Sequence, residues 1–196
     1  MIIHISGPSG SGKTTLGKKL KKKFGEKIVV KDLDDLVAGF LKSRYRGDKP
    51  GIEIHRLYQN HIENYIKKHD DKIIVFVGLN VGNTGNYFVY YDVHADYKYY
   101  IELNDDLIVE KKCERFLVEY IPEAFKNIKD VLMYDNKMFI KDMIKLVKQE
   151  CDSKEIKRSN KIWNRDYKKL GYKFMSRENI LKEVSRMVKN EISKNS

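Results

Sequence analysis

The chain has 196 residues, of which 41% are hydrophobic and 34% are charged, and its formal net charge at pH 7 is +11. This composition is typical of a globular protein, and no apolar run approaches the roughly eighteen residues that a membrane span needs. The opening MIIHIS turns polar too soon for a signal peptide, and Cys113 and Cys151 give neither a disulfide framework nor a metal-ligand spacing. We therefore expect one domain over residues 1–196, located in the cytoplasm and without a membrane partner.

The positive charge has two interpretations. Clustered lysines, as in KKLKKK at 18–23, attract polyanions because they release counterions from phosphate backbones. However, only 8 of the 39 basic residues are Arg, and Asn, Ile and Tyr are abundant, which an AT-rich coding sequence produces by itself. A nucleic-acid partner is therefore an alternative that we do not favour, and we expect KKLKKK to be the solvated face of a helix.

Strands and helices alternate along the chain. Apolar runs predict strands, and helical periodicity fills the intervals between them. A GDKPG break divides the segment between residues 34 and 69 into two helices, and Asn104 or Asp105 is expected to cap a later one. The expected strands are 2–6, 27–32, 72–81, 97–103 and 171–176. Alternation of this kind predicts an α/β fold in three layers, with a five-stranded parallel sheet and helices on both faces.

A phosphate-binding loop follows the first predicted strand. GPSGSGKT, residues 7–14, matches the pattern G-x-x-x-x-G-K-[ST] and leads into a predicted helix. Its glycines allow backbone N–H groups to face phosphate, and the helix N-terminus favours negative charge. We expect Lys13 to reach the β- and γ-phosphates of ATP and the Thr14 hydroxyl to bind Mg²⁺. The residues expected to contact the nucleotide here are Gly7, Pro8, Ser9, Gly10, Ser11, Gly12, Lys13, Thr14 and Thr15.

The loop, an acidic end to the second strand and a long helical segment between the fourth and fifth strands resemble small P-loop kinases, the group of the nucleoside monophosphate (adenylate) and shikimate kinases. The resemblance covers nearly the whole chain. It implies the three-layer P-loop NTPase fold, use of ATP and Mg²⁺, an acceptor-covering helical segment at about 36–70 and a helical lid at about 105–170. The likeness is specific at the loop and only general beyond it.

KDLDDL, residues 31–36, places carboxylates where such sheets bind ligands. In shikimate-kinase-like enzymes the resembling pattern is Asp-x-Asp, matched by Asp32 and Asp34, which implies a base that orients the acceptor or a ligand of the metal shell. In polynucleotide 5′-kinases it is an Asp-Asp pair, matched by Asp34 and Asp35. A third interpretation is that Asp34 only caps the following helix.

The third strand departs from the usual pattern of P-loop proteins, because VFVGLN lacks the acid that completes the Mg²⁺ shell. Asp32 or Asp34 then supplies it, or the protein binds nucleotide without efficient turnover. Gly78 matches the glycine that many such kinases place where the substrate approaches. Kinases that accept a phosphate group need arginines, and the acceptor segment contains Arg44, Arg46 and Arg56.

Further arginines match the lid of the family. Arg115 resembles the arginine at the root of the lid, while Arg158 and Arg165 are candidates to neutralise charge on the transferring phosphoryl group. The loop after the last strand, with Arg177, is expected beside the base. His4 is expected to be a hydrogen-bonded core residue.

The predicted function is an ATP- and Mg²⁺-dependent phosphotransferase that acts on a nucleoside, a nucleotide or another small acceptor with a hydroxyl or phosphate group. Lys13, Asp32, Asp34, Arg115, Arg158 and Arg165 are the candidate catalytic residues, with Thr14 and Asp32 at the metal. The alternatives are a polynucleotide 5′-kinase and a catalytically weak nucleotide-binding regulator. The sequence does not determine the oligomeric state.

Overall fold

The structure is a computed structural model that describes residues 1–44, 51–83, 88–90, 92–120 and 136–194. Its contacts divide the chain into two compact units. The first unit contains residues 1–7, 12–102 and 170–196, and the second contains 8–11 and 103–169. Each unit is described by itself.

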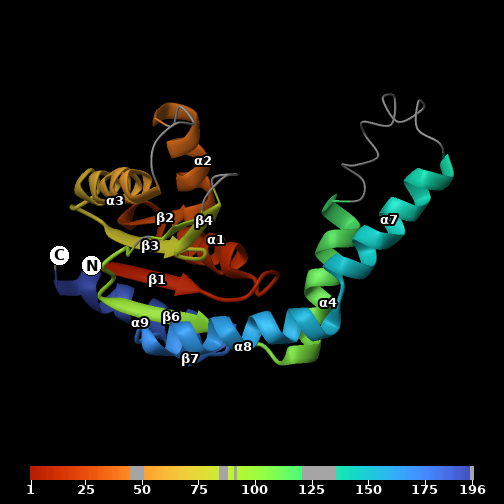
Figure 1. The fold of residues 1–196 in the computed structure, drawn as a ribbon. Coiled ribbons are helices and arrows are strands. Elements are labelled where there is room, and N and C mark those ends of the chain that lie inside the picture. The colour runs from red at the N-terminus through yellow and green to blue at the C-terminus, as the bar shows by residue number, and fades with distance from the viewer. Residues whose placement is uncertain (45–50, 84–87, 91, 121–135, 195–196) are drawn as a thin grey trace. The chain divides into compact units, whose positions relative to one another are not determined.

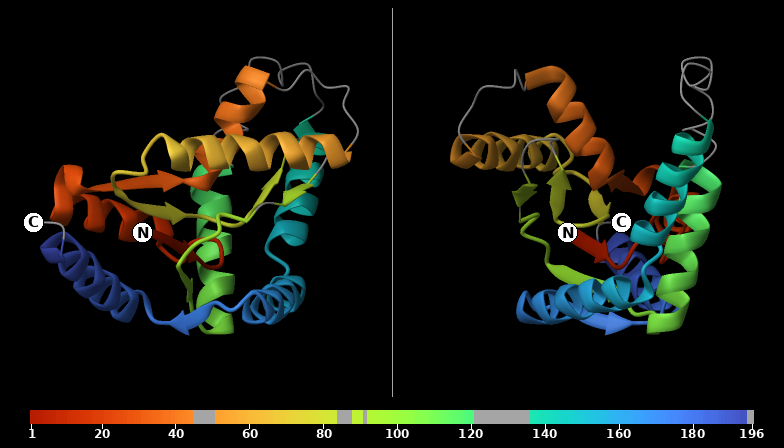
Figure 2. Two further views of the ribbon diagram at one scale, coloured as in Figure 1. Left: turned by 90° about the vertical axis from the view of Figure 1, so that its left-hand side faces the viewer. Right: turned by 45° about the vertical axis from the view of Figure 1, so that its right-hand side comes forward.

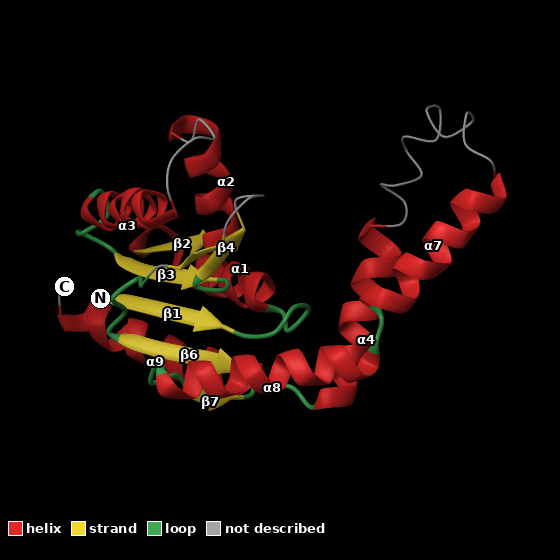
Figure 3. Cartoon of the chain, in the orientation of Figure 1, coloured by secondary structure: helices red, strands yellow, loops and turns green. Residues whose placement is uncertain are grey.

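A five-stranded parallel sheet forms the centre of the first unit (Figures 1 and 3). The strand order is β2-β3-β1-β6-β7, so that β1 lies between β3 and β6. In register, Ile5 of β1 pairs with Val77 on one side and with Tyr99 on the other. The strands are β1 (Ile2–Ser6), β2 (Ile28–Asp32), β3 (Ile73–Val77), β6 (Tyr97–Ile101) and β7 (Lys173–Met175). The five predicted parallel strands are thereby confirmed.

Helices α1 (Lys13–Phe24) and α9 (Arg177–Lys194) cover one face of this sheet (Figure 2). Gly17 brings α1 close, since a Cβ there would lie 2.8 Å from Val30 of β2. On the β6 side, the Tyr99 hydroxyl donates a hydrogen bond to Glu183 of α9. A 3-10 turn, η1 (Gly25–Lys27), connects α1 to β2.

Helices α2 (Leu33–Arg44) and α3 (Gly51–Lys67) cover the opposite face. Their apolar side chains form one cluster with Ile74 and Phe76 of β3 and with Val93. The helical members are Leu33, Leu36, Val37, Phe40, Ile54, Tyr58 and Ile62. Burial of each such side chain stabilises the fold by about 1.5–3 kcal/mol relative to exposure. The described part of the chain therefore confirms an α/β fold in three layers.

The third strand is shorter than the sequence predicts. The predicted segment was 72–81, but the strand ends at Val77 because Gly78 has φ +130°, outside the extended region. Val81–Asn83 (β4) instead pairs antiparallel with Phe88–Tyr90 (β5), a hairpin that the sequence analysis did not predict.

The second unit is helical in its described residues. It contains α4 (Asp105–Arg115), the π-helical η2 (Phe116–Tyr120), α7 (Asn136–Glu150) and α8 (Ser153–Lys169). Asn104 caps α4, as expected, by accepting a hydrogen bond from the backbone N–H of Leu107 at 2.7 Å. Helix α8 packs against α4, with Asn160 donating to Asp105 at 3.1 Å. Whether this unit acts as a lid, and whether the chain behaves as one domain, stay predictions.

Across the ranges that the structure describes, no helix is both long and apolar enough to pass through a membrane.

Candidate functional site

The two ends of the phosphate-binding loop lie in the first unit. Strand β1 ends at Ser6, and α1 begins at Lys13. The Lys13 ammonium donates a hydrogen bond to the Gly7 carbonyl at 2.9 Å, so this cation lies against the loop. Gly12 has φ +84°, a conformation that glycine adopts without strain, and it immediately precedes α1. The first N–H groups of α1 have no acceptor within the helix, which favours an anion at this end.

The middle of the loop, residues 8–11, belongs to the second unit. A turn forms where Ser11 N–H donates to the Pro8 carbonyl at 3.2 Å. Gly10 passes so close to α4 that a Cβ would lie 2.8 Å from the Cβ of Lys111. The Ser11 hydroxyl is buried without a hydrogen-bond partner among the residues that the structure describes, which fits a group that contacts a phosphate oxygen.

Asp32 connects the second strand to the loop helix. Its Oδ2 accepts a hydrogen bond from the Thr14 hydroxyl at 2.9 Å, and its Oδ1 accepts one from the backbone N–H of Asp34 at 3.1 Å. A hydroxyl and a carboxylate side by side form the hard oxygen donor set that Mg²⁺ prefers, so these side chains fit the metal. That Asp32 substitutes for the missing acid of the third strand stays a prediction.

The capping interpretation of Asp34 is wrong, because Asp32 accepts the N–H bond at the start of α2 and Asp34 lies inside the first turn. Asp34 is exposed there. Its neighbour Asp35 lies 3.7 Å from the ammonium of Lys31. Asp35 thus has Lys31 of β2 as a cationic partner.

A buried chain of hydrogen bonds holds Gly78 beside Asp32. The Gly78 carbonyl is 3.0 Å from His4 Nε2, and His4 Nδ1 is hydrogen-bonded to the Tyr172 hydroxyl. Since a carbonyl only accepts, Nε2 carries the proton and Tyr172 donates to Nδ1. Burial lowers the pKa of His4 to about 4, so the ring is neutral near pH 7.

Gly78 is closely confined by Asp32 and its neighbour. A Cβ at Gly78 would lie 3.1 Å from the Cβ of Leu33 and 3.4 Å from Asp32 Oδ1. The expectation of a satisfied core residue at His4 is confirmed by its two partners. The role of Tyr172 was missed, because it lies 168 positions away along the chain and nothing local in the sequence pairs the two side chains.

Two of the predicted nucleotide-contacting arginines touch the loop within their own units. In the first unit, Arg177 Nη1 lies 2.9 Å from where a Cβ on Gly12 would be. In the second unit, Arg115 donates from Nη1 to the Ser9 hydroxyl at 3.1 Å and from Nε to Glu119 at 2.7 Å.

Among the described side chains, Arg56, Arg158 and Arg165 have no hydrogen bond or ion pair with the loop. Arg158 and Arg165 pair with Glu155 and Asp166 on α8. Arg56 is exposed on α3, and Arg44 is the last residue of α2. Arg46 lies outside the described residues, so the acceptor arginines stay predictions.

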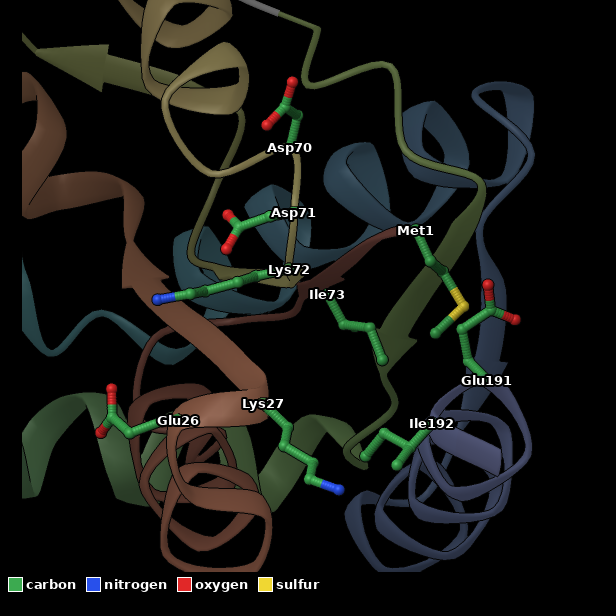
Figure 4. Close-up of a pocket in the computed structure, with 9 residues that line it drawn as sticks. All are labelled: Met1, Glu26, Lys27, Asp70, Asp71, Lys72, Ile73, Glu191 and Ile192. Atoms are coloured by element: carbon green, nitrogen blue, oxygen red, sulfur yellow. The ribbon is translucent and has the colours of Figure 1, made fainter. Parts of the chain in front are cut away.

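A separate pocket of about 330 Å³ lies in the first unit at the amino ends of β1 and β3 (Figure 4). Met1, Ile73 and Ile192 supply its apolar wall. The charged lining residues are Glu26, Lys27, Asp70, Asp71, Lys72 and Glu191. Ligands of open α/β sheets bind at the opposite, carboxyl ends of the strands, so this pocket is not part of the candidate site.

No family model matches the chain, and no curated protein sequence matches it. Among solved structures, it is similar to a tRNA Δ(2)-isopentenylpyrophosphate transferase from Staphylococcus epidermidis at 14% identity, covering 100% of this chain and 99% of that one, with a TM-score of 0.46. A shikimate kinase from Aquifex aeolicus matches at 14% identity over 98% of both chains, with a TM-score of 0.41. A shikimate kinase from Bacteroides thetaiotaomicron matches at 18% identity over 66% of this chain and 79% of that one, with a TM-score of 0.36.

The chain's own features determine the fold. A glycine-rich loop follows the central strand of a parallel sheet ordered β2-β3-β1-β6-β7, and α1 begins directly after it. The chain therefore has a small P-loop kinase-like fold.

Proposed function

We propose that the protein is a phosphotransferase that uses ATP and Mg²⁺ to phosphorylate a small acceptor, a nucleoside, a nucleotide or another molecule with a hydroxyl or phosphate group. The observation that carries this proposal is a hydrogen bond to Asp32 from the hydroxyl of Thr14, the residue directly after Lys13. It joins the loop that binds a triphosphate to a carboxylate at the strand end where an acceptor would approach.

The loop residues would bind and orient the triphosphate. Lys13 and the N-terminus of α1 would supply positive charge toward the β- and γ-phosphates. Thr14 and Asp32 would hold Mg²⁺, which neutralises charge that develops on the phosphoryl oxygens. Arg177 at Gly12 and Arg115 at Ser9 contribute further cations beside the loop.

Asp34 is the proposed base. It would orient the acceptor hydroxyl and accept its proton as the oxygen forms a bond to the γ-phosphorus and the bond to ADP breaks. Asp34 is preferred to Asp35 because it belongs to the Asp-x-Asp pattern with Asp32, whose carboxylate accepts its backbone N–H. Arg158 and Arg165 receive no role in this proposal, since each pairs with a carboxylate on its own helix.

The test is phosphate transfer from ATP to nucleosides, nucleoside monophosphates, shikimate-like hydroxy acids and 5′-hydroxyl oligonucleotides. We expect transfer to a small acceptor, reduced at least about 10²-fold in Asp34→Asn, with the Kd for ATP retained. Asp35→Asn is the matched control and should change the rate less than about threefold, because exposed ion pairs contribute little. ATP binding without transfer to any acceptor would contradict the proposal and favour a nucleotide-binding regulator. Transfer to oligonucleotides alone would favour a polynucleotide 5′-kinase.

A further inference from the structure

Helix α1 contains a higher proportion of lysine than the chain as a whole. One residue in seven of the chain is acidic, 28 of 196, yet none of the 12 residues of α1 is, and six of them are Lys. Lys makes up six of the 12 residues of α1 but only 31 of the 196 residues of the chain, so a coding bias that acts along the whole chain does not account for its concentration in this helix.

One of these lysines has a structural role. Lys21 donates to the Gly25 and Ile28 carbonyls at 2.9 and 3.1 Å and pairs with Glu26 at 3.3 Å, so it closes the end of α1. The other exposed lysines of α1 form no ion pair with the described residues; they are Lys18, Lys19, Lys22 and Lys23.

These four exposed lysines form two i, i+4 rows. The row Lys18–Lys22 lies opposite the buried Leu16 and Leu20, and the row Lys19–Lys23 lies along the edge of that buried face, at i+3 from the two leucines. Neighbouring like charges at this spacing destabilise a helix by about 0.2–0.5 kcal/mol per pair. The helix dipole offsets part of this repulsion only in the last turn. Stability alone therefore does not explain both rows.

Helix α9 continues the basic surface beside α1. Arg177 at the start of α9 lies against Gly12, which immediately precedes α1. Helices α1 and α9 pack against each other. From its solvent face, α9 adds the exposed Lys182 and Lys189. We call these six side chains, Lys18, Lys19, Lys22, Lys23, Lys182 and Lys189, the lysine surface.

The chemistry of the lysine surface fits a chain of phosphates. Rows at i and i+4 rise about 6 Å along the helix, so several ammonium groups are presented in sequence and not at one point. None of the large apolar side chains exposed among the described residues lies on α1 or α9. An anchoring helix at a membrane needs such side chains beside its lysines, and an apolar protein interface needs them at its centre. We propose that the lysine surface binds the phosphate backbone of a nucleic acid.

This site is distinct from the proposed acceptor site. The lysines are exposed on helices that cover one face of the sheet, whereas Asp34 lies in the first turn of α2, which packs on the opposite face. Binding should therefore need neither ATP nor turnover. A failure of the kinase proposal would leave this inference standing, and the reverse also holds.

The experiment measures the Kd of the full-length chain for a fluorescent 20-residue oligothymidylate, without ATP or Mg²⁺, from 50 to 200 mM NaCl. If four lysines contact phosphates, the slope of log K against log salt is about −3, and affinity falls roughly 50-fold over this range. Lys19→Glu/Lys23→Glu should make the slope shallower by about 1.4, and Lys19→Arg/Lys23→Arg should keep it.

The matched control is Lys67→Glu/Lys68→Glu, which makes the same charge change on exposed residues at the end of α3. This pair changes the net charge by the same amount but lies outside the lysine surface. It should therefore leave the slope of log K against log salt within about 0.3 of the value for the unmodified chain. The inference would be overturned if the Lys19→Glu/Lys23→Glu and Lys67→Glu/Lys68→Glu variants lost affinity equally. It would also be overturned if the unmodified chain did not bind the oligonucleotide. Binding only to phosphatidylserine vesicles would also overturn it, in favour of a membrane surface. Phosphotransfer to a small acceptor should change less than twofold in the Lys19/Lys23 variants.

Discussion

The acidic residues predicted for the site and the arginines predicted for the lid are held in different ways. Asp32 is the last residue of β2, and two hydrogen bonds from the loop helix and α2 fix its carboxylate. Arg158 and Arg165 lie on an amphipathic helix, where exposed carboxylates one and three positions away along the sequence are their partners. A strand end determines where a side chain points, whereas a helix surface offers a long cation several partners.

The largest expected effect is at Asp32. Asp32→Asn should lower kcat about 10³-fold, because it removes the charge that would face Mg²⁺ beside Thr14. The unfolding free energy should fall by no more than about 1.5 kcal/mol, since an amide oxygen still accepts the N–H of Asp34. Steady-state kinetics at several Mg²⁺ concentrations and urea unfolding measure the two quantities.

Thr14→Ser is the matched control, because it keeps the hydroxyl that donates to Asp32. It should retain kcat within about tenfold, whereas Thr14→Val should approach the loss seen in Asp32→Asn. If Asp32→Asn keeps more than a tenth of the activity, Asp32 is only a helix cap.

The difference between residues at strand ends and residues on helix surfaces also explains which features could be predicted from the sequence. The loop could be placed because it follows directly from a strand that its apolar run identifies, and Asp32 because it is the last residue of the next strand. Gly78 was expected inside the third strand, but it lies directly after the last residue of that strand. The hairpin of β4 and β5 was not predicted, because two three-residue strands leave no periodicity to detect. The partners of Arg115 and Tyr172 could not be predicted either, since they lie 106 and 168 positions away.

His4 gives the second expected effect, on stability. Burial holds the pKa of His4 at about 4 in the folded state, against 6.5 for an exposed histidine, so the unfolded chain binds a proton first as pH falls. The stability contributed by the neutral ring is complete above about pH 6.5 and is lost between there and about pH 4. Between pH 7.5 and pH 5, the unfolding free energy should fall by about 2 kcal/mol from this residue.

Urea unfolding at these two pH values measures the effect, with two variants for comparison. In His4→Gln, the difference in unfolding free energy between pH 7.5 and pH 5 should be smaller by about 2 kcal/mol. Tyr172→Phe should keep the pH dependence while lowering stability at both values by about 1 kcal/mol, because a buried acceptor loses its donor. The same pH dependence in His4→Gln and the unmodified chain would show that other groups cause it.

The smallest expected effect tests whether a helical arginine can act in the site at all. Arg115 differs from Arg158 and Arg165 because one of its N–H groups reaches Ser9 of the loop, while Nε is held by Glu119. Arg115→Gln should raise the KM for ATP about tenfold, as expected when one hydrogen bond from a charged group is lost. Arg158→Gln and Arg165→Gln should raise it less than about threefold, since each loses only an exposed ion pair. Equal effects at all three positions would mean that contact with the loop does not distinguish Arg115, and that the lid acts through its summed charge.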